Sequence, residues 1–166
     1  ALYALVPIAL IIFLPTSLIR RLSPLALVAV VFLLSLTLFS SFGQQKFGSR
    51  RWLEIAGLPS IQPSEFAKIA IALYYGAYFA KRSDLDKEQR RFIIPALVAL
   101  FVTALILAGR DYSSALLFLA QCGAMLIAAG LHWQSLALLF AFIVPPAVVA
   151  LFSQGYRIRR IISFLM

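Results

Sequence analysis

Residues 61–80 read IQPSEFAKIAIALYYGAYFA, and this stretch decides the fold. After one acid and one lysine near its start, the next twelve residues carry no charge. A helix needs about 20 mostly apolar residues to cross the hydrocarbon core of a bilayer. Pro63 suits the first turn of such a helix, where its missing N–H costs nothing. The stretch therefore predicts a membrane-spanning helix.

Five further stretches are similarly apolar and nearly as long. Backbone groups in lipid must form hydrogen bonds within their own element, so these runs are expected to be helices. The sequence predicts an all-α fold, a polytopic transmembrane helix bundle with about six spans in a single domain over residues 1–166. The expected spans are Ala1–Ile19, Leu25–Phe42, Ile61–Ala80, Ile93–Ala108, Tyr112–Gly130 and Gln134–Phe152.

The composition agrees with lipid as the main solvent. Hydrophobic residues make up 63% of the chain and charged residues 13%, against about 45–50% and 25% in soluble domains. The net charge of +9 comes without a recognisable nucleic-acid motif, so membrane lipids rather than nucleic acid are the expected partner of the basic residues. The single cysteine, Cys122, lies in an apolar run and is expected to be a small buried residue.

The connections between the spans differ in charge. We expect a tight turn at 20–24, an outer loop at 43–60, a charged cytoplasmic loop at 81–92 and, at 153–166, the start of a large outer loop. The two faces carry equal numbers of lysines and arginines, so the positive-inside rule does not orient the chain. We place loop 43–60 outside, on the interpretation that its arginines are retained for chemistry or binding.

Two ionisable side chains stand near the start of the third expected span. Glu65 lies in the first helical turn, where the helix dipole favours an acid, and Lys68 follows three residues later on the same face. They are either a cap and an ion pair at the membrane interface or a functional site. The functional site is the alternative because ionisable residues within membrane helices face the bundle interior or a wet cavity.

Arg50, Arg51 and Trp52 follow one another in the expected outer loop. They are either an interfacial anchor, since Trp and Arg favour the headgroup zone, or a clamp for an anionic headgroup. A guanidinium group matches two phosphate oxygens with parallel hydrogen bonds, which favours the clamp. Adjacency in sequence does not choose between the two.

Asp111 stands directly before the fifth expected span. We expect it to be the N-cap of that helix, with Arg110 as its counter-ion. His132 has no second ligand at metal spacing and is expected at the membrane interface, so no metal site is predicted.

Three segments together resemble a known family. They are RWL at 51–53, QPSEFAK at 62–68 and the basic segment GYRIRRI at 155–161. This combination is similar to the SEDS family of RodA and FtsW cell-wall proteins, and the middle block is its most specific part. The family pattern QPDxGT reads GRDYSS at 109–114 here, so only the aspartate is kept.

The resemblance implies a larger enzyme of about ten spans in the bacterial cytoplasmic (inner) membrane. Such proteins are peptidoglycan glycosyltransferases that polymerise glycan strands from lipid II with a class B penicillin-binding protein. Their catalytic aspartate would lie beyond Met166, so this chain alone is expected to be an inactive part, which agrees with its apolar ends. Use of a divalent cation stays open. The implied site residues are a catalytic cavity pair, Glu65 and Lys68, and lipid II contacts at Arg50, Arg51, Trp52, Gln62, Ser64 and Asp111.

Two other classes of function fit the same residues. A flippase or transporter of lipid-linked precursors also uses a helix bundle with charged residues, although transporters often show repeated halves and none is visible here. A membrane scaffold subunit of a cell-wall synthesis complex would need no catalytic loop. A lipid II polymerisation assay with a flipping control separates these alternatives.

Overall fold

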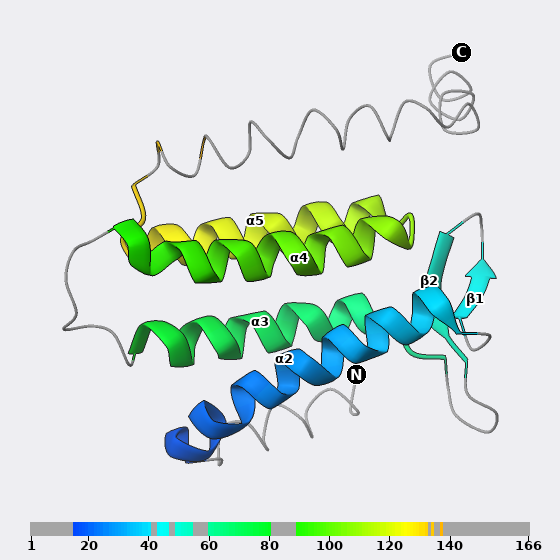
Figure 1. The fold of residues 1–166 in the computed structure, drawn as a ribbon, viewed down its shortest axis with the longest axis horizontal. Helices are drawn as coiled ribbons and strands as arrows, with labels where there is room; N and C mark the ends of the chain where they lie inside the picture. Colours follow the sequence, from blue (N-terminus) through cyan, green and yellow to red (C-terminus); the bar gives the residue numbers. More distant parts are fainter. Residues whose placement is uncertain are drawn as a thin grey trace, which may run out of the picture.

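The structure, a computed structural model, describes residues 15–40, 43–46, 49–54, 60–80 and 89–132, together with 134 and 137. In this part of the chain four helices form a bundle, and a two-stranded hairpin lies at one end of it (Figure 1). The helices are α2 (Thr16–Phe39), α3 (Pro63–Ala80), α4 (Ile93–Ala108), which follows the short 3-10 helix η1 (Gln89–Phe92), and α5 (Tyr112–Ala128). The strands are β1 (Gly43–Lys46) and β2 (Ser49–Leu53).

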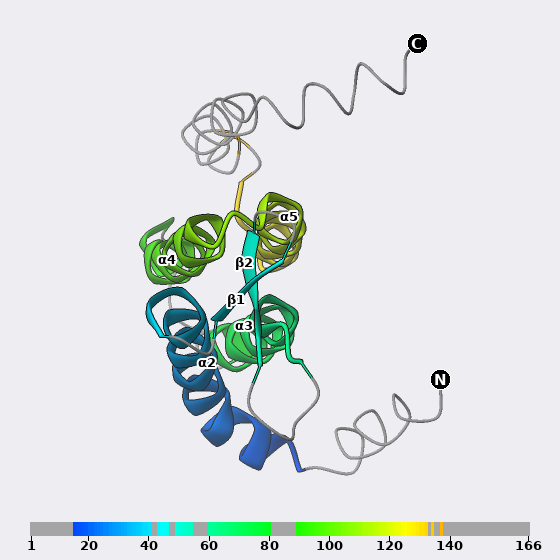
Figure 2. The same ribbon diagram turned by 90° about the vertical axis from the view of Figure 1, so that its right-hand side faces the viewer.

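Successive helices run in opposite directions. Helices α2 and α4 end at the hairpin, whereas α3 and α5 begin there (Figure 1). Seen along the bundle, α2 and α3 form one side and α4 and α5 the other (Figure 2). The hairpin end therefore gathers two helix N-termini and two helix C-termini.

The centre of the bundle is closely packed. Tyr75 of α3, Val102 of α4 and Phe118 of α5 are fully buried in one cluster. Small side chains between them, such as Ala67, allow the helices to approach closely. The expected spans at α3 and α4 are confirmed as helices, and the helix expected from Tyr112 ends slightly earlier than Gly130, at Ala128.

Large apolar side chains also cover the outward faces. Seven of these side chains, on α2, α4 and α5, are each more than half exposed. A helix that is apolar on its exposed as well as its buried side is typical of a membrane protein. Among the described helices, α2 alone is both long and apolar enough to cross a bilayer by those criteria, while α4 and α5 are apolar but shorter. The exposed residues are Leu25, Val28, Phe32, Leu97, Phe101, Leu116 and Leu117.

The expected turn at 20–24 is wrong, because α2 continues through it. Proline lacks an N–H, so Pro24 leaves the carbonyl of Arg20 without its usual helical partner. The hydroxyl of Ser23 donates to that carbonyl at 3.2 Å and partly compensates. Residues 16–19, assigned by sequence to the first span, belong to this same helix.

The expected outer loop at 43–60 contains strands that the sequence did not indicate. β1 and β2 pair antiparallel, with Gly43 opposite Leu53 and a bulge after Gln44. Leu53 also exchanges two backbone hydrogen bonds with Ile61, just before α3. The hairpin is thereby tied to the start of α3.

Several expectations concern residues outside the described part. These are most of the span Ala1–Ile19, nearly all of Gln134–Phe152, most of the loop 81–92 and all of the segment 153–166.

Candidate functional site

Arg50 anchors the hairpin to two helix ends. Its guanidinium donates to the carbonyls of Leu38 at 3.0 Å, Ser40 at 2.7 Å and Gly43 at 3.1 Å. Its backbone N–H donates to the carbonyl of Gly109, at the end of α4, at 2.9 Å. A cation is favoured at a helix C-terminus, where carbonyls lack partners. Since the guanidinium is occupied in this way, the geometry favours a positioning role for Arg50 over contact with a substrate.

Gly109 permits the close approach of β2 to α4. A Cβ at this position would lie 2.7 Å from the carbonyl oxygen of Arg50. We expect Gly109→Ala to push the hairpin away and to lower the free energy of unfolding by about 1–3 kcal/mol, as overpacking does. Thermal unfolding in detergent measures the change.

Gly76→Ala is the matched control, because a Cβ at Gly76 would meet nothing within 4 Å. It should leave stability unchanged or raise it by about 0.5–1 kcal/mol, since alanine favours a helix over glycine. Equal midpoints for the two variants would contradict the close approach.

Asp111 is the hub of a buried polar cluster at the hairpin end. It is 3% exposed and caps α5 by accepting from the backbone N–H of Ser114 at 3.4 Å, which confirms the expected N-cap. The amide of Gln62 donates to its carboxylate at 3.0 Å, and the hydroxyl of Ser64 donates to it at 3.3 Å. The same amide also approaches the hydroxyls of Ser64 and Ser114. The cluster therefore joins the starts of α3 and α5.

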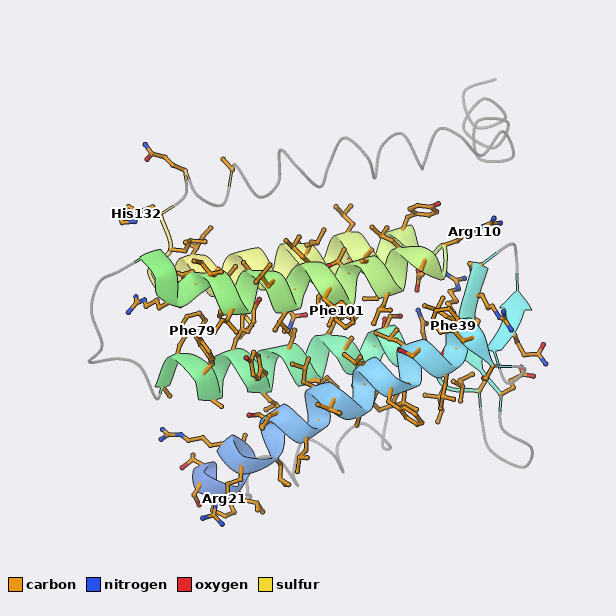
Figure 3. The ribbon with its side chains drawn as sticks, viewed as in Figure 1. Arg21, Phe39, Phe79, Phe101, Arg110 and His132 are labelled. Atoms are coloured by element: carbon orange, nitrogen blue, oxygen red, sulfur yellow. The ribbon has the colours of Figure 1, made fainter. Side chains whose placement is uncertain are left out.

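Arg51 forms an ion pair with Asp111. Its Nη1 lies 3.6 Å from the Asp111 carboxylate, and its side chain is 33% exposed. The expected counter-ion, Arg110, is wrong: it is exposed, in a left-handed turn with φ 59° between α4 and α5, and it lies at the hairpin end of the bundle (Figure 3). A long-range contact from β2 has replaced the sequence neighbour.

Glu65 and Lys68 form an ion pair on α3, with Nζ and Oε2 2.8 Å apart. The side chain of Lys68 is 24% exposed and that of Glu65 53%. Gln121 of α5 donates to the backbone carbonyl of Lys68 at 2.8 Å, and such bonds hold membrane helices together. The sequence interpretation missed Gln121, although a glutamine within an apolar span was a visible signal.

The predicted site residues thus fall into three groups. Gln62, Ser64, Asp111 and Arg51 meet in one cluster, the pair Glu65–Lys68 lies beside it on α3, and Arg50 braces the hairpin. Trp52 is partly buried on β2, opposite Gln44. In the described part of the chain, no cluster of three His, Cys, Asp or Glu residues suits a metal ion.

The opposite end of the bundle holds a second bracing arginine. Arg91 donates to the carbonyl of Ala129, the C-cap of α5, at 2.9 Å. Its guanidinium lies 4.7 Å from the centre of the Phe92 ring, and Tyr78 of α3 donates to its carbonyl at 3.1 Å. Arg21 and His132 lie toward this same end (Figure 3). Arg91 therefore plays the part at this end that Arg50 plays at the hairpin end.

Comparisons with known proteins agree on one family. The family model FTSW_RODA_SPOVE, described as cell cycle protein, matches residues 1–166. A probable peptidoglycan glycosyltransferase FtsW of Geobacter sp. (strain M18) is 35% identical over 135 residues, which are 81% of this chain and 36% of the relative. Stage V sporulation protein E of Bacillus subtilis is 32% identical over 147 residues, 88% of this chain and 40% of the relative.

Solved structures agree with this relationship. The rod shape determining protein RodA of Thermus thermophilus has a TM-score of 0.65 and 28% identity, over 80% of this chain and 43% of its own. A structure concerning polymerization and crosslinking by a peptidoglycan synthase complex has a TM-score of 0.70 and 28% identity, over 92% of this chain and 45% of its own.

This chain spans about two fifths of the length of the curated relatives it matches. The family model nevertheless covers it from end to end, so the resemblance found in the block at 62–68 is confirmed. The chain belongs to the FtsW, RodA and SpoVE family of cell cycle proteins.

Proposed function

We propose that the protein containing this chain polymerises glycan strands from lipid II in the bacterial cytoplasmic membrane. We further propose that the chain crosses that membrane about six times, with the hairpin end outside. The names of the relatives support the activity, and the apolar outward faces of the bundle support the location. The observation that carries the proposal is the Glu65–Lys68 ion pair on an apolar helix beside the Asp111 cluster.

The proposed reaction is the displacement of a lipid-linked pyrophosphate by a sugar hydroxyl. A bond forms between the hydroxyl oxygen and the anomeric carbon, the bond from that carbon to the pyrophosphate breaks, and the hydroxyl proton passes to a base. Such a reaction needs a base and charge stabilisation at the leaving group. Lys68, oriented by Glu65 at 2.8 Å, would supply positive charge within the membrane. The base would lie in a part of the protein outside this chain.

Arg51 is the better candidate for contact with the leaving group. One-third of its side chain is exposed, and a guanidinium binds phosphate oxygens with two hydrogen bonds. Arg50 would act indirectly, since its guanidinium donors are directed to helix carbonyls. A class B penicillin-binding protein is the proposed partner, in keeping with the synthase complex among the similar structures.

A polymerisation assay on the full-length protein tests the function. Purified protein, with and without its penicillin-binding partner, is incubated with labelled lipid II, and the glycan products are separated by length. Long glycan strands are expected. Flipping of a fluorescent lipid II in vesicles without any polymer would instead favour the transporter alternative and contradict the proposal.

Arg51→Ala is expected to weaken binding of lipid II by about ten- to a hundredfold, because one charge-assisted contact is worth about 1.5–3 kcal/mol. Affinity is measured on the full-length protein in detergent. Arg21→Ala, at the opposite end of the bundle, serves as the matched charge control and should bind as the unaltered protein does. Unchanged affinity of the Arg51 variant would refute the contact.

A further inference from the structure

The ion pair between Arg51 and Asp111 is not a direct hydrogen bond. Its atoms are 3.6 Å apart, whereas hydrogen bonds from nitrogen to oxygen are about 2.7–3.2 Å long. The Nε of Arg51 is buried, and no protein group in the described part of the chain accepts its hydrogen. A buried donor left in this state costs about 1–3 kcal/mol. The geometry calls for a small bridging group.

A partly open cavity is lined by both residues. Its volume is ≈ 10 Å³, close to the roughly 10–15 Å³ that one water molecule needs. The polar and charged residues of the wall are Thr37, Arg50, Arg51, Ser64 and Asp111. A buried water makes about three hydrogen bonds, and the unpaired Nε of Arg51 and the carboxylate of Asp111 would supply two of its partners. Leu34 and Ile106 lie on the apolar side of the wall, together with Leu38, Pro63 and Leu105.

The chemistry of the wall selects the occupant. The group must accept a hydrogen bond from the Nε of Arg51 and donate one to the carboxylate of Asp111. An anion without a hydrogen of its own cannot donate to the carboxylate and is repelled by it, and a metal cation is repelled by the guanidinium groups of Arg50 and Arg51. We propose that this cavity is a binding site for one ordered water, which bridges Arg51 of β2 to Asp111 of α5.

The bridge would explain how the guanidinium of Arg51 is held in position while some of its hydrogen-bond donors stay available. A water-mediated contact is nearly as favourable in enthalpy as a direct one, so the guanidinium stays in place. Its exposed remainder keeps donors for an anionic ligand. This last consequence rests on the proposed function, whereas the water site itself does not.

Radiolytic hydroxyl labelling of the full-length protein tests the site without any lipid II. A short X-ray pulse converts bound water to hydroxyl radicals, which oxidise the side chains beside it, and mass spectrometry locates the products. Leu34 and Ile106 should be oxidised although both are buried. Val102 and Phe118 are fully buried away from the cavity wall and should stay unmodified, although a phenyl ring is intrinsically reactive.

Arg51→Met removes the donor but keeps a long side chain. The oxidation of Leu34 and Ile106 should fall to the level of Val102, with Phe118 still protected as evidence that the bundle is folded. Protection of Leu34 and Ile106 in the unaltered protein would overturn the proposal. So would undiminished oxidation in the Arg51 variant, because the water would then not depend on Arg51. Neither result depends on whether the protein polymerises glycan.

Discussion

Replacing Asp111 with alanine is expected to destabilise the bundle by about 3 kcal/mol, near the lower end of what breaking a buried charged pair costs. The change leaves Arg51 without its counter-ion and removes the acceptor for Gln62 and Ser64. It also removes the N-cap of α5, which alone is worth about 1 kcal/mol. The exposure of Arg51 keeps the total at the lower end.

Thermal unfolding in detergent measures this effect, and Ser113→Ala provides the control. Ser113 is the exposed neighbour of Ser114 in the first turn of α5. The unfolding midpoint of the Ser113→Ala variant should therefore equal that of the unaltered protein. The midpoint of Asp111→Asn should fall between those of Asp111→Ala and Ser113→Ala, because asparagine can cap a helix but carries no charge to pair with Arg51. An Asp111→Ala midpoint equal to that of Ser113→Ala would show that the cluster adds no stability.

A double-mutant cycle with Arg51→Ala separates the ionic contribution from the capping contribution. Side chains in contact couple by about 0.5–3 kcal/mol. If a water bridges Arg51 to Asp111, the coupling should be measurable although the atoms are 3.6 Å apart. Strict additivity would mean that the two charges do not interact.

Replacing Glu65 with alanine is expected to abolish glycan polymerisation by the full-length protein. Lys68 would lose its partner at 2.8 Å, and an ionisable group within a membrane helix that loses its partner is expected to move toward another polar group or water. Membrane expression should be unaffected, because half of the Glu65 side chain is exposed and removing it opens no internal cavity. Polymerisation of labelled lipid II is the measurement.

Glu65→Gln and Phe66→Leu sharpen this experiment. Glutamine keeps the size of the side chain without its charge, so this variant should also be inactive if the charge on Glu65 matters. Phe66 is the exposed neighbour of Glu65, and its conservative replacement should retain activity. Normal polymerisation by Glu65→Ala would remove the ion pair from the proposed mechanism.

The equal basic charge of the two faces has a structural reason at two positions. Arg50 and Arg91 lie at opposite ends of the bundle, and each donates to the carbonyls that end a helix. The sequence interpretation assigned the outer arginines to a substrate. The hydrogen bonds that Arg50 donates to the carbonyls at the C-terminus of α2 are a sufficient reason for its presence. Of the two arginines, Arg51 is therefore the one whose guanidinium can bind a ligand.

The sequence by itself determined three of the described helices and the family. Long apolar runs in lipid can satisfy their backbone groups only as helices, so α3, α4 and α5 were predictable from residue order. The pair Glu65 and Lys68 was equally predictable, because residues three apart on a helix lie on one face. The block QPSEFAK at 62–68 contained enough specific residues to indicate the family, which the family model confirms.

Only the tertiary structure decided what the polar residues do. Gln62 and Asp111 are 49 residues apart in sequence, and no local pattern shows that they meet at the hairpin end. The hairpin itself follows from long-range bonds, from Arg50 to the ends of α2 and α4 and from Leu53 to Ile61. Local spacing favoured Arg110 as the partner of Asp111, but the approach of β2 to the start of α5 selected Arg51. Contacts between distant segments depend on how the helices pack, and the local spacing of residues along the chain does not reveal that packing.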